Sequence, residues 1–343
     1  MKKSINKDTI SNIIYNSRYP LALLVVMIHC KLPTNIDFGS FIIREYILYF
    51  CSVAVPLFFL FSGYLYFLGV ESFDKETYRI KTKKRIKTLV IPYLFWNTLY
   101  LLFHVSRYYF SHDSFLSSGC KSIESYSLFD WISCYFYQNV ITSISSYYPL
   151  NVPLWFLRDL IIYVLFSPLI YYLVKKVSIV YIIVLLLSWV IFGTGDIGFI
   201  LIGISFFSVG AYFAIHKRYD LYFRNAWLYV LLLVFVILSP IFVDDGSMRR
   251  LGTLLGCILF ILLIGSVPNK NIRLCYLGNY SMFIYLSQAI VLAFVQKMLL
   301  FDNNIMQMLS LWILSVTICM LFYKILEKTN CKLLWVWGIK TIR

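Results

Sequence analysis

Two ionisable residues, Arg18 and His29, lie at the ends of one apolar run, RYPLALLVVMIHC. Eleven positions are about three turns of an α-helix, so the two side chains lie on one face and about 16 Å apart along the axis. His29 is thereby predicted near the midplane of a bilayer. An imidazole there could serve as a general base or proton relay, since it exchanges protons near neutral pH. The alternative is a hydrogen bond between buried helices.

A second apolar run, VPLFFLFSGYL, contains Pro56 and the pair Ser62–Gly63. Small residues let two helices approach closely, so the pair could be a packing notch. The alternative is unwound backbone that lines a cavity, with Ser62 or Tyr64 hydrogen-bonded to a substrate. The residues leave both interpretations open.

A third polar group lies in GNYSMFIYLSQ, where Ser281, Tyr285 and Gln288 are spaced by four and three residues. This spacing places the three side chains on one helical stripe. A fourth run, LWFLRDL, carries Arg158 and Asp159 side by side. Because neighbouring residues of a helix do not face each other, we expect each to pair with another helix or to reach the outer interface.

The composition identifies the medium in which these residues lie. The chain has 343 residues, of which 60% are hydrophobic and 14% charged, and its mean hydropathy is +0.77. Soluble domains are about 45–50% apolar and about 25% charged. A soluble enzyme, a disordered chain and a coiled coil are therefore excluded. The sequence predicts an all-α, polytopic transmembrane helical bundle that forms a single domain over residues 1–343.

Membrane helices need roughly 17–25 mostly apolar residues, and about ten segments of the chain qualify. They are residues 17–35, 46–70, 88–110, 152–174, 178–194, 196–215, 226–243, 250–267, 280–301 and 305–326. Nine spans are the main alternative, because the fifth and sixth segments nearly touch.

The excess of 31 basic over 16 acidic residues is distributed unevenly. If the amino terminus is cytoplasmic, the inner segments carry 22 Lys and Arg residues and the outer segments carry 5. Cytoplasmic loops of membrane proteins are enriched in Lys and Arg, so both termini are predicted in the cytoplasm, as tails 1–16 and 327–343. The net charge of +15 thus indicates topology, and no nucleic-acid partner is expected.

Two connecting segments are long enough to act on substrates. The cytoplasmic loop 71–87 carries seven basic residues. It could lie against anionic lipid or bind a phosphorylated substrate. The outer loop 111–151 contains apolar residues at helical spacing from Leu128 to Phe136, which indicates an interfacial helix. It could be a stabilising lid or part of an acceptor site.

Cysteine and histidine give no sign of a metal site. Cys30, Cys51, Cys257 and Cys319 lie inside apolar runs, and we interpret them as small buried hydrophobic residues. The four histidines do not cluster, and no ligand spacing typical of zinc occurs. No bound metal is expected.

These motifs together resemble the integral-membrane acyltransferase family 3, whose members include bacterial O-acetyltransferases of surface polysaccharides. The resemblance rests on the basic residue and His in the first helix, VPLFFLFSGYL, KKRIKTLVIPYLFW, LWFL at 154–157 and LGNYSMFIYL at 277–286. These motifs follow in the family's order over about residues 18–290. One position departs from the pattern, because many members carry His where this chain has Gln288.

The resemblance implies an O-acetyltransferase that moves an acyl group, in particular acetyl, from acyl-CoA to a hydroxyl of a surface polysaccharide or glycolipid. His29 and Arg18 would be catalytic, and the substrate-binding residues would be Ser62, Tyr64, Lys84, Arg85, Trp155, Ser281, Tyr285 and Gln288. Acetyl-CoA is expected as a donor substrate, with no bound cofactor. The expected location is the plasma membrane of a bacterium, within the lipid bilayer. The alternatives are a transporter or flippase of a lipid-linked sugar and a catalytically lapsed scaffold, which Gln288 suggests.

Overall fold

The computed structural model is described for residues 7–30, 38–111, 123–137, 147–217, 226–238, 246–266, 272–299, 304–329 and 334–339. These residues form α-helices and a few short turns of 3₁₀- or π-helix, without a strand among them, which confirms the predicted all-α class. The first half of this part contains α1 (Lys7–Ile28), α2 (Phe38–Cys51), α3 (Ala54–Phe67), α4 (Lys75–Arg85), α5 (Ile91–Ser111), α6 (Leu128–Ser133), α7 (Trp155–Leu165) and α8 (Ser167–Val177). The second half contains α9 (Ile179–Phe192), α10 (Gly195–Ile215), α11 (Ala226–Leu238), α12 (Gly246–Ser266), α13 (Ile272–Leu277), α14 (Ser281–Met298) and α15 (Asn304–Lys328).

Each of the ten predicted segments contains a helix, but not every one is a straight span. Among the described residues, six helices are long and apolar enough to cross a membrane. A seventh candidate is the pair α7 and α8, which meet at a bend of 69°. The predicted fourth span, 152–174, is therefore a broken helix. The count of ten spans and the cytoplasmic termini remain predictions.

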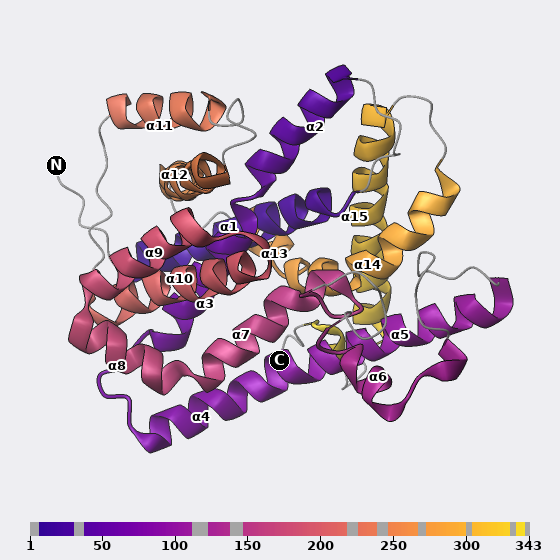
Figure 1. Ribbon diagram of the computed structural model, residues 1–343, viewed down its shortest axis with the longest axis horizontal. Helices are drawn as coiled ribbons and strands as arrows, with labels where there is room; N and C mark the ends of the chain where they lie inside the picture. Colours follow the sequence, from indigo (N-terminus) through magenta and orange to yellow (C-terminus); the bar gives the residue numbers. More distant parts are fainter. Residues whose placement is uncertain are drawn as a thin grey trace.

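The predicted basic loop 71–87 is mostly helical, which corrects its description as a loop. Helix α4 covers Lys75–Arg85, a π-helical turn η1 covers Ile86–Val90, and α5 continues from there. The three elements form one helical rod over Lys75–Phe110, basic in α4 and apolar in α5, which is visible along the lower part of Figure 1. Asp74 begins it, because its carboxylate accepts a hydrogen bond from the Thr77 backbone N–H at 2.8 Å.

The backbones of α3 and α10 approach each other closely at two glycines. A Cβ atom added at Gly63 would lie 2.1 Å from the Phe207 carbonyl oxygen, and one at Gly210 would lie 1.9 Å from that of Leu60. Helix α3 is continuous through Ser62 and Gly63. The structure therefore favours the packing notch over unwound backbone.

Helix α1 lies inside the bundle, next to α3 and α12–α15 (Figure 1). The Trp312 indole of α15 donates a hydrogen bond to the Leu23 carbonyl of α1 at 2.9 Å. The four cysteines read as buried hydrophobic residues are buried and unpaired, as predicted. The fold thus surrounds the helix that carries Arg18 with protein on several sides.

Candidate functional site

Basic side chains of α4 meet the end of α3 at Tyr66. The Lys81 ammonium donates a hydrogen bond to the Tyr66 carbonyl at 2.6 Å. The Arg85 guanidinium lies 5.9 Å from the centre of the Tyr66 ring, within cation–π range. The Tyr66 hydroxyl is 2.9 Å from that of Ser167, at the start of α8. Tyr66 is therefore the point where α3, α4 and α8 are joined.

Arg18 of α1 extends this group of cations. It lies close enough to Arg85 for the two positive charges to repel each other. Its guanidinium also lies 4.8 Å from the ring centre of Tyr15. Arg18, Lys81 and Arg85, here called the cation cluster, come from two helices that are far apart in the sequence. Like charges held together in this way form a ready site for an anion with several phosphates.

A π-helical turn follows the cation cluster directly. Arg85 is the residue before η1, and the turn ends at Ile91, where α5 begins. Such turns are rare and occur frequently at functional sites, because they redirect side chains within a helix. Here the turn lies between the basic end of the rod and its buried aromatic part.

His29 directly follows α1, in a turn whose backbone N–H bonds to the Val26 carbonyl at 3.0 Å. The helix between Arg18 and His29 is continuous, so their predicted separation along the axis stands. The predicted span 17–35 ends as a helix at Ile28, and residues 31–37 lie outside the described part.

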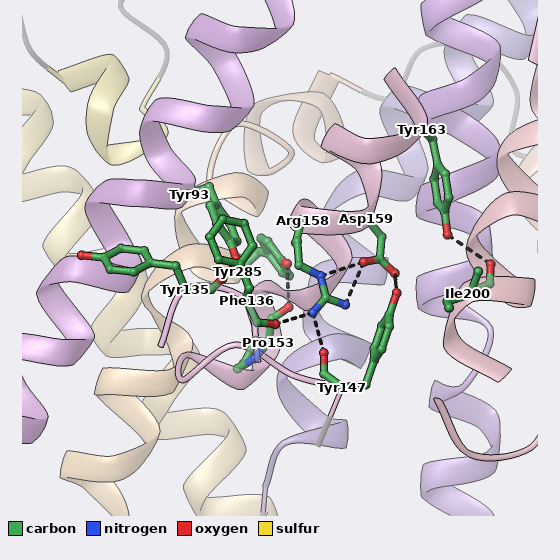
Figure 2. A network of polar contacts seen from close by, with 10 residues as sticks. All are labelled: Tyr93, Tyr135, Phe136, Tyr147, Pro153, Arg158, Asp159, Tyr163, Ile200 and Tyr285. Atoms are coloured by element: carbon green, nitrogen blue, oxygen red, sulfur yellow. Dashed lines mark hydrogen bonds and ion pairs between the residues drawn. The ribbon is translucent and has the colours of Figure 1, made fainter. Parts of the chain in front are cut away.

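Arg158 and Asp159 were expected to pair with another helix or to reach the outer interface. They pair with each other rather than with another helix, and their further partners, Phe136 and Tyr147, lie in the predicted outer loop 111–151. The Arg158 Nε donates to the Asp159 carboxylate at 2.9 Å, and both side chains are buried (Figure 2). Adjacent helical residues point apart, but the long Arg side chain curves back to its neighbour. In a region with little water, two charges gain more from pairing than from staying apart.

The same pair fastens the segment predicted as the outer loop, 111–151, to α7. Arg158 Nη1 donates to the carbonyl oxygens of Phe136, at 2.7 Å, and Tyr147. The Tyr147 hydroxyl donates to Asp159 at 2.8 Å. Burial, and next the charge of Asp159, raises the pKa of Tyr147, so its hydroxyl stays a donor. Figure 2 shows the Asp159 carboxylate and the Phe136 and Tyr147 carbonyl oxygens around the Arg158 guanidinium.

The predicted stripe on α14 divides into three different environments. The Ser281 hydroxyl donates to the Gly278 carbonyl at 2.7 Å, which is a local contact at the helix start. The Tyr285 hydroxyl donates to the Pro153 carbonyl at 2.6 Å (Figure 2). Gln288 is fully buried, and neither atom of its amide has a hydrogen-bond partner among the described residues.

The remaining predicted residues are spread over the bundle. Ser62 is half-buried in α3 and Tyr64 is buried there. Trp155 packs on Phe199, with ring centres 5.0 Å apart, and so belongs to an aromatic part of the core. Lys84 is exposed on α4. The structure brings Arg18 and Arg85 together, but it does not unite all ten predicted residues in one place.

Three further residues belong with Gln288, and the sequence indicated only Trp96, as part of the motif KKRIKTLVIPYLFW. Asn97, Asn151 and Trp96 are buried, and each has a polar side-chain atom without a hydrogen-bond partner among the described residues. The only sequence signal of Asn97 and Asn151 is a single amide in an apolar or aromatic context. That signal is weak, since lone buried amides also occur in ordinary cores.

A family model described as an acyltransferase domain, of acyltransferase family 3, matches residues 17–324. The match includes every residue of the cation cluster, His29, and helices α2 to α14. No curated protein and no solved structure matches the chain significantly.

Proposed function

The chain belongs to acyltransferase family 3 and is a membrane acyltransferase, and on that premise we propose that it transfers acetyl from acetyl-CoA to a glycan hydroxyl. The acceptor is a surface polysaccharide or a glycolipid at the outer face of a bacterial plasma membrane. The observation that carries the proposal is the cation cluster, in which Lys81 and Arg85 both lie against Tyr66 and Arg18 of a separate helix is within electrostatic range of Arg85.

The donor explains why cations gather at this place. CoA carries its negative charge on phosphates at one end and its thioester at the other, joined by an extended arm. Arg binds phosphate with two parallel hydrogen bonds, whereas Lys binds it as a point charge. With the phosphates at the cation cluster, the arm would follow α1 from Arg18 toward His29, about 16 Å away along the helix axis.

His29 then acts as the general base. It accepts the proton of the acceptor hydroxyl while the hydroxyl oxygen bonds to the thioester carbonyl carbon. The tetrahedral intermediate collapses, the carbon–sulfur bond breaks, and the imidazolium returns the proton to the departing CoA thiolate. The ester product and free CoA complete the balance. The sequence contains no nucleophile elbow, GxSxG, so direct transfer is preferred over a covalent enzyme intermediate.

A binding measurement tests the donor site without knowledge of the acceptor. Purified protein in detergent is titrated with CoA by isothermal calorimetry, with Arg85→Gln as the test variant. Arg79→Gln is the matched control, because Arg79 lies on the same helix, is exposed, and has only a 3.9 Å ion pair with Glu76. Loss of a charged hydrogen bond is worth about 1.5–3 kcal/mol, so Arg85→Gln should raise the Kd roughly tenfold to a hundredfold.

The contrary results are equally clear. If Arg85→Gln and Arg79→Gln change the Kd equally, the cation cluster is not the phosphate site. If the wild-type protein does not bind CoA at all, a CoA thioester is not the donor. Dephospho-CoA, which lacks one phosphate, would show whether the cluster holds that phosphate: its Kd should then be insensitive to Arg85→Gln.

A further inference from the structure

Several buried polar atoms that have no hydrogen-bond partner within the described part of the chain lie where α5, the segment 150–153 and α14 meet. They are Trp96 Nε1, Asn97 Oδ1, Asn151 Oδ1 and both amide atoms of Gln288. All four residues are at least nine-tenths buried. Because a buried polar group without a hydrogen bond is destabilising, this many in one region call for a ligand.

Contacts from three parts of the chain bring these residues together. The Asn151 amide donates to the Trp96 carbonyl at 3.4 Å, which places Asn151 beside the turn of α5 that carries Asn97. The Trp96 ring packs on Phe283 of α14, with ring centres 5.7 Å apart. Segment 150–153 thus lies against the aromatic turn of α5, and this turn lies against α14.

Gln288 is enclosed by contacts on both sides along α14. One turn before it, Tyr285 bonds to the Pro153 carbonyl at 2.6 Å. Directly after it, Ala289 and Ile290 pack against the apolar group that includes Leu150. Gln288 therefore lies at the level of segment 150–153, which also carries Asn151.

We propose that Asn97, Asn151 and Gln288, with the Trp96 indole, bind the hydroxyl groups of the acceptor sugar. Side-chain amides both donate and accept hydrogen bonds, as sugar hydroxyls do, and the indole N–H adds a donor. None of these groups carries charge, so the site suits a neutral polyol and not the anionic donor. The proposal rests on the proposed function and gives the acceptor a place apart from the cation cluster.

The position of the site agrees with this role. Asn151 and Pro153 lie between the outer segment and α7, and Arg158 fixes Phe136 and Tyr147 of the same segment. A sugar that arrives from the outer face would meet this segment first. Lys81 and Arg85 of the cation cluster belong to the basic part of the rod, before the π-helical turn, whereas Trp96 and Asn97 follow that turn.

The decisive variant is Gln288→Leu, which has a similar volume and no polar atoms. If the Gln288 amide has only a structural role, its loss should leave acyl transfer intact. If it binds acceptor, the variant loses acyl transfer at least tenfold, keeps the Kd for CoA, and melts at an equal or higher temperature. Sites that bind ligands commonly sacrifice stability in this way.

Three measurements are made on each variant. They are the melting temperature of the purified protein, its Kd for CoA by calorimetry, and the ester-linked acetyl content of surface glycans in the native host. Asn97→Leu and Asn151→Ala are compared with Ser315→Ala, whose buried hydroxyl also lacks a partner among the described residues but lies on α15. We expect loss of glycan acetyl in the first two and none in Ser315→Ala.

Normal glycan acetylation in Gln288→Leu and Asn97→Leu would overturn the proposal and leave ordered water as the ligand of these atoms. Asn97→Leu and Asn151→Ala also lose hydrogen bonds to the carbonyl oxygens of Tyr93 and Trp96. A lower melting temperature in these two variants would therefore not decide the matter, whereas Gln288→Leu would. Failure of the proposed function looks different, because the wild-type protein itself would then neither bind CoA nor acetylate glycans.

Discussion

The Arg158 guanidinium and the Asp159 carboxylate form a buried ion pair between consecutive residues, with Nη2 and Oδ1 2.9 Å apart. Removal of one partner leaves a buried charge without its counter-ion, which costs about 3–5 kcal/mol, whereas joint replacement by apolar residues is often neutral. We expect Arg158→Met to lower the melting temperature strongly, and the double variant with Asp159→Leu to recover part of the loss. Thermal unfolding in detergent measures both. A double variant that is as unstable as the sum of the single variants would refute the coupling.

The close packing of α3 on α10 predicts an unequal response of two glycines. A Cβ at Gly210 meets the Leu60 backbone, which cannot move without its helix, so Gly210→Ala should cost about 1–3 kcal/mol. Gly265→Ala is the control, because its Cβ meets only the end of the Ile13 side chain, at 3.3 Å. The yield of monodisperse protein and its melting temperature compare the two. Equal effects would show that the helix contact is not tight.

Arg250 of α12 holds the carboxyl end of α9, where it donates to the carbonyl oxygens of Val190 at 2.9 Å and Gly193 at 3.1 Å. A cation at a helix carboxyl end contributes up to about 2 kcal/mol when partly buried, so Arg250→Met should lower the melting temperature. Arg249→Met is the comparison, since Arg249 has one half-exposed ion pair with Glu45, worth about 0–1 kcal/mol. Similar losses in both variants would contradict the capping role.

Asp74, at the start of α4, predicts a pH dependence of stability. The hydrogen bond from the Thr77 backbone lowers the pKa of Asp74 in the folded state. Its contribution is therefore present above the unfolded-state pKa, near 4, and disappears as the pH falls through the lower folded value. Asp74→Asn keeps a capping oxygen that does not titrate. The difference in melting temperature between the two proteins should be constant above about pH 5 and change below it. A constant difference down to about pH 2 would contradict the assignment.

The sequence predicted those features that depend on periodicity and composition. The apolar runs contain helices, and the spacing of Arg18 and His29 along α1 is as expected. The basic segment 71–87 was placed correctly as a cationic region, but its helical structure and the π-turn after Arg85 were missed. The density of charge identified the segment as a connection between spans. It could not show that the segment continues as a helix into the following span.

Contacts between distant segments could not be predicted. Asn97 and Asn151 are 54 positions apart, and only the fold places Asn151 beside Trp96 and brings both to α14, which carries Gln288. The pairing of Arg158 with Asp159 was missed although the two are neighbours in the sequence. The rule that adjacent helical residues point apart does not allow for a long, flexible side chain. A long Arg side chain among buried groups follows the nearest negative charge instead.

The central claim is that this membrane acyltransferase uses His29 to acetylate a surface glycan. The most direct test is the ester-linked acetyl content of surface glycans in the native host after deletion, and after restoration with the wild-type chain or His29→Gln. General base catalysis contributes about 10²–10⁴-fold, so we expect restoration by the wild type and almost none by His29→Gln at equal protein level. Unchanged acetyl content in the deletion strain would contradict the claim, and full restoration by His29→Gln would remove His29 as the base.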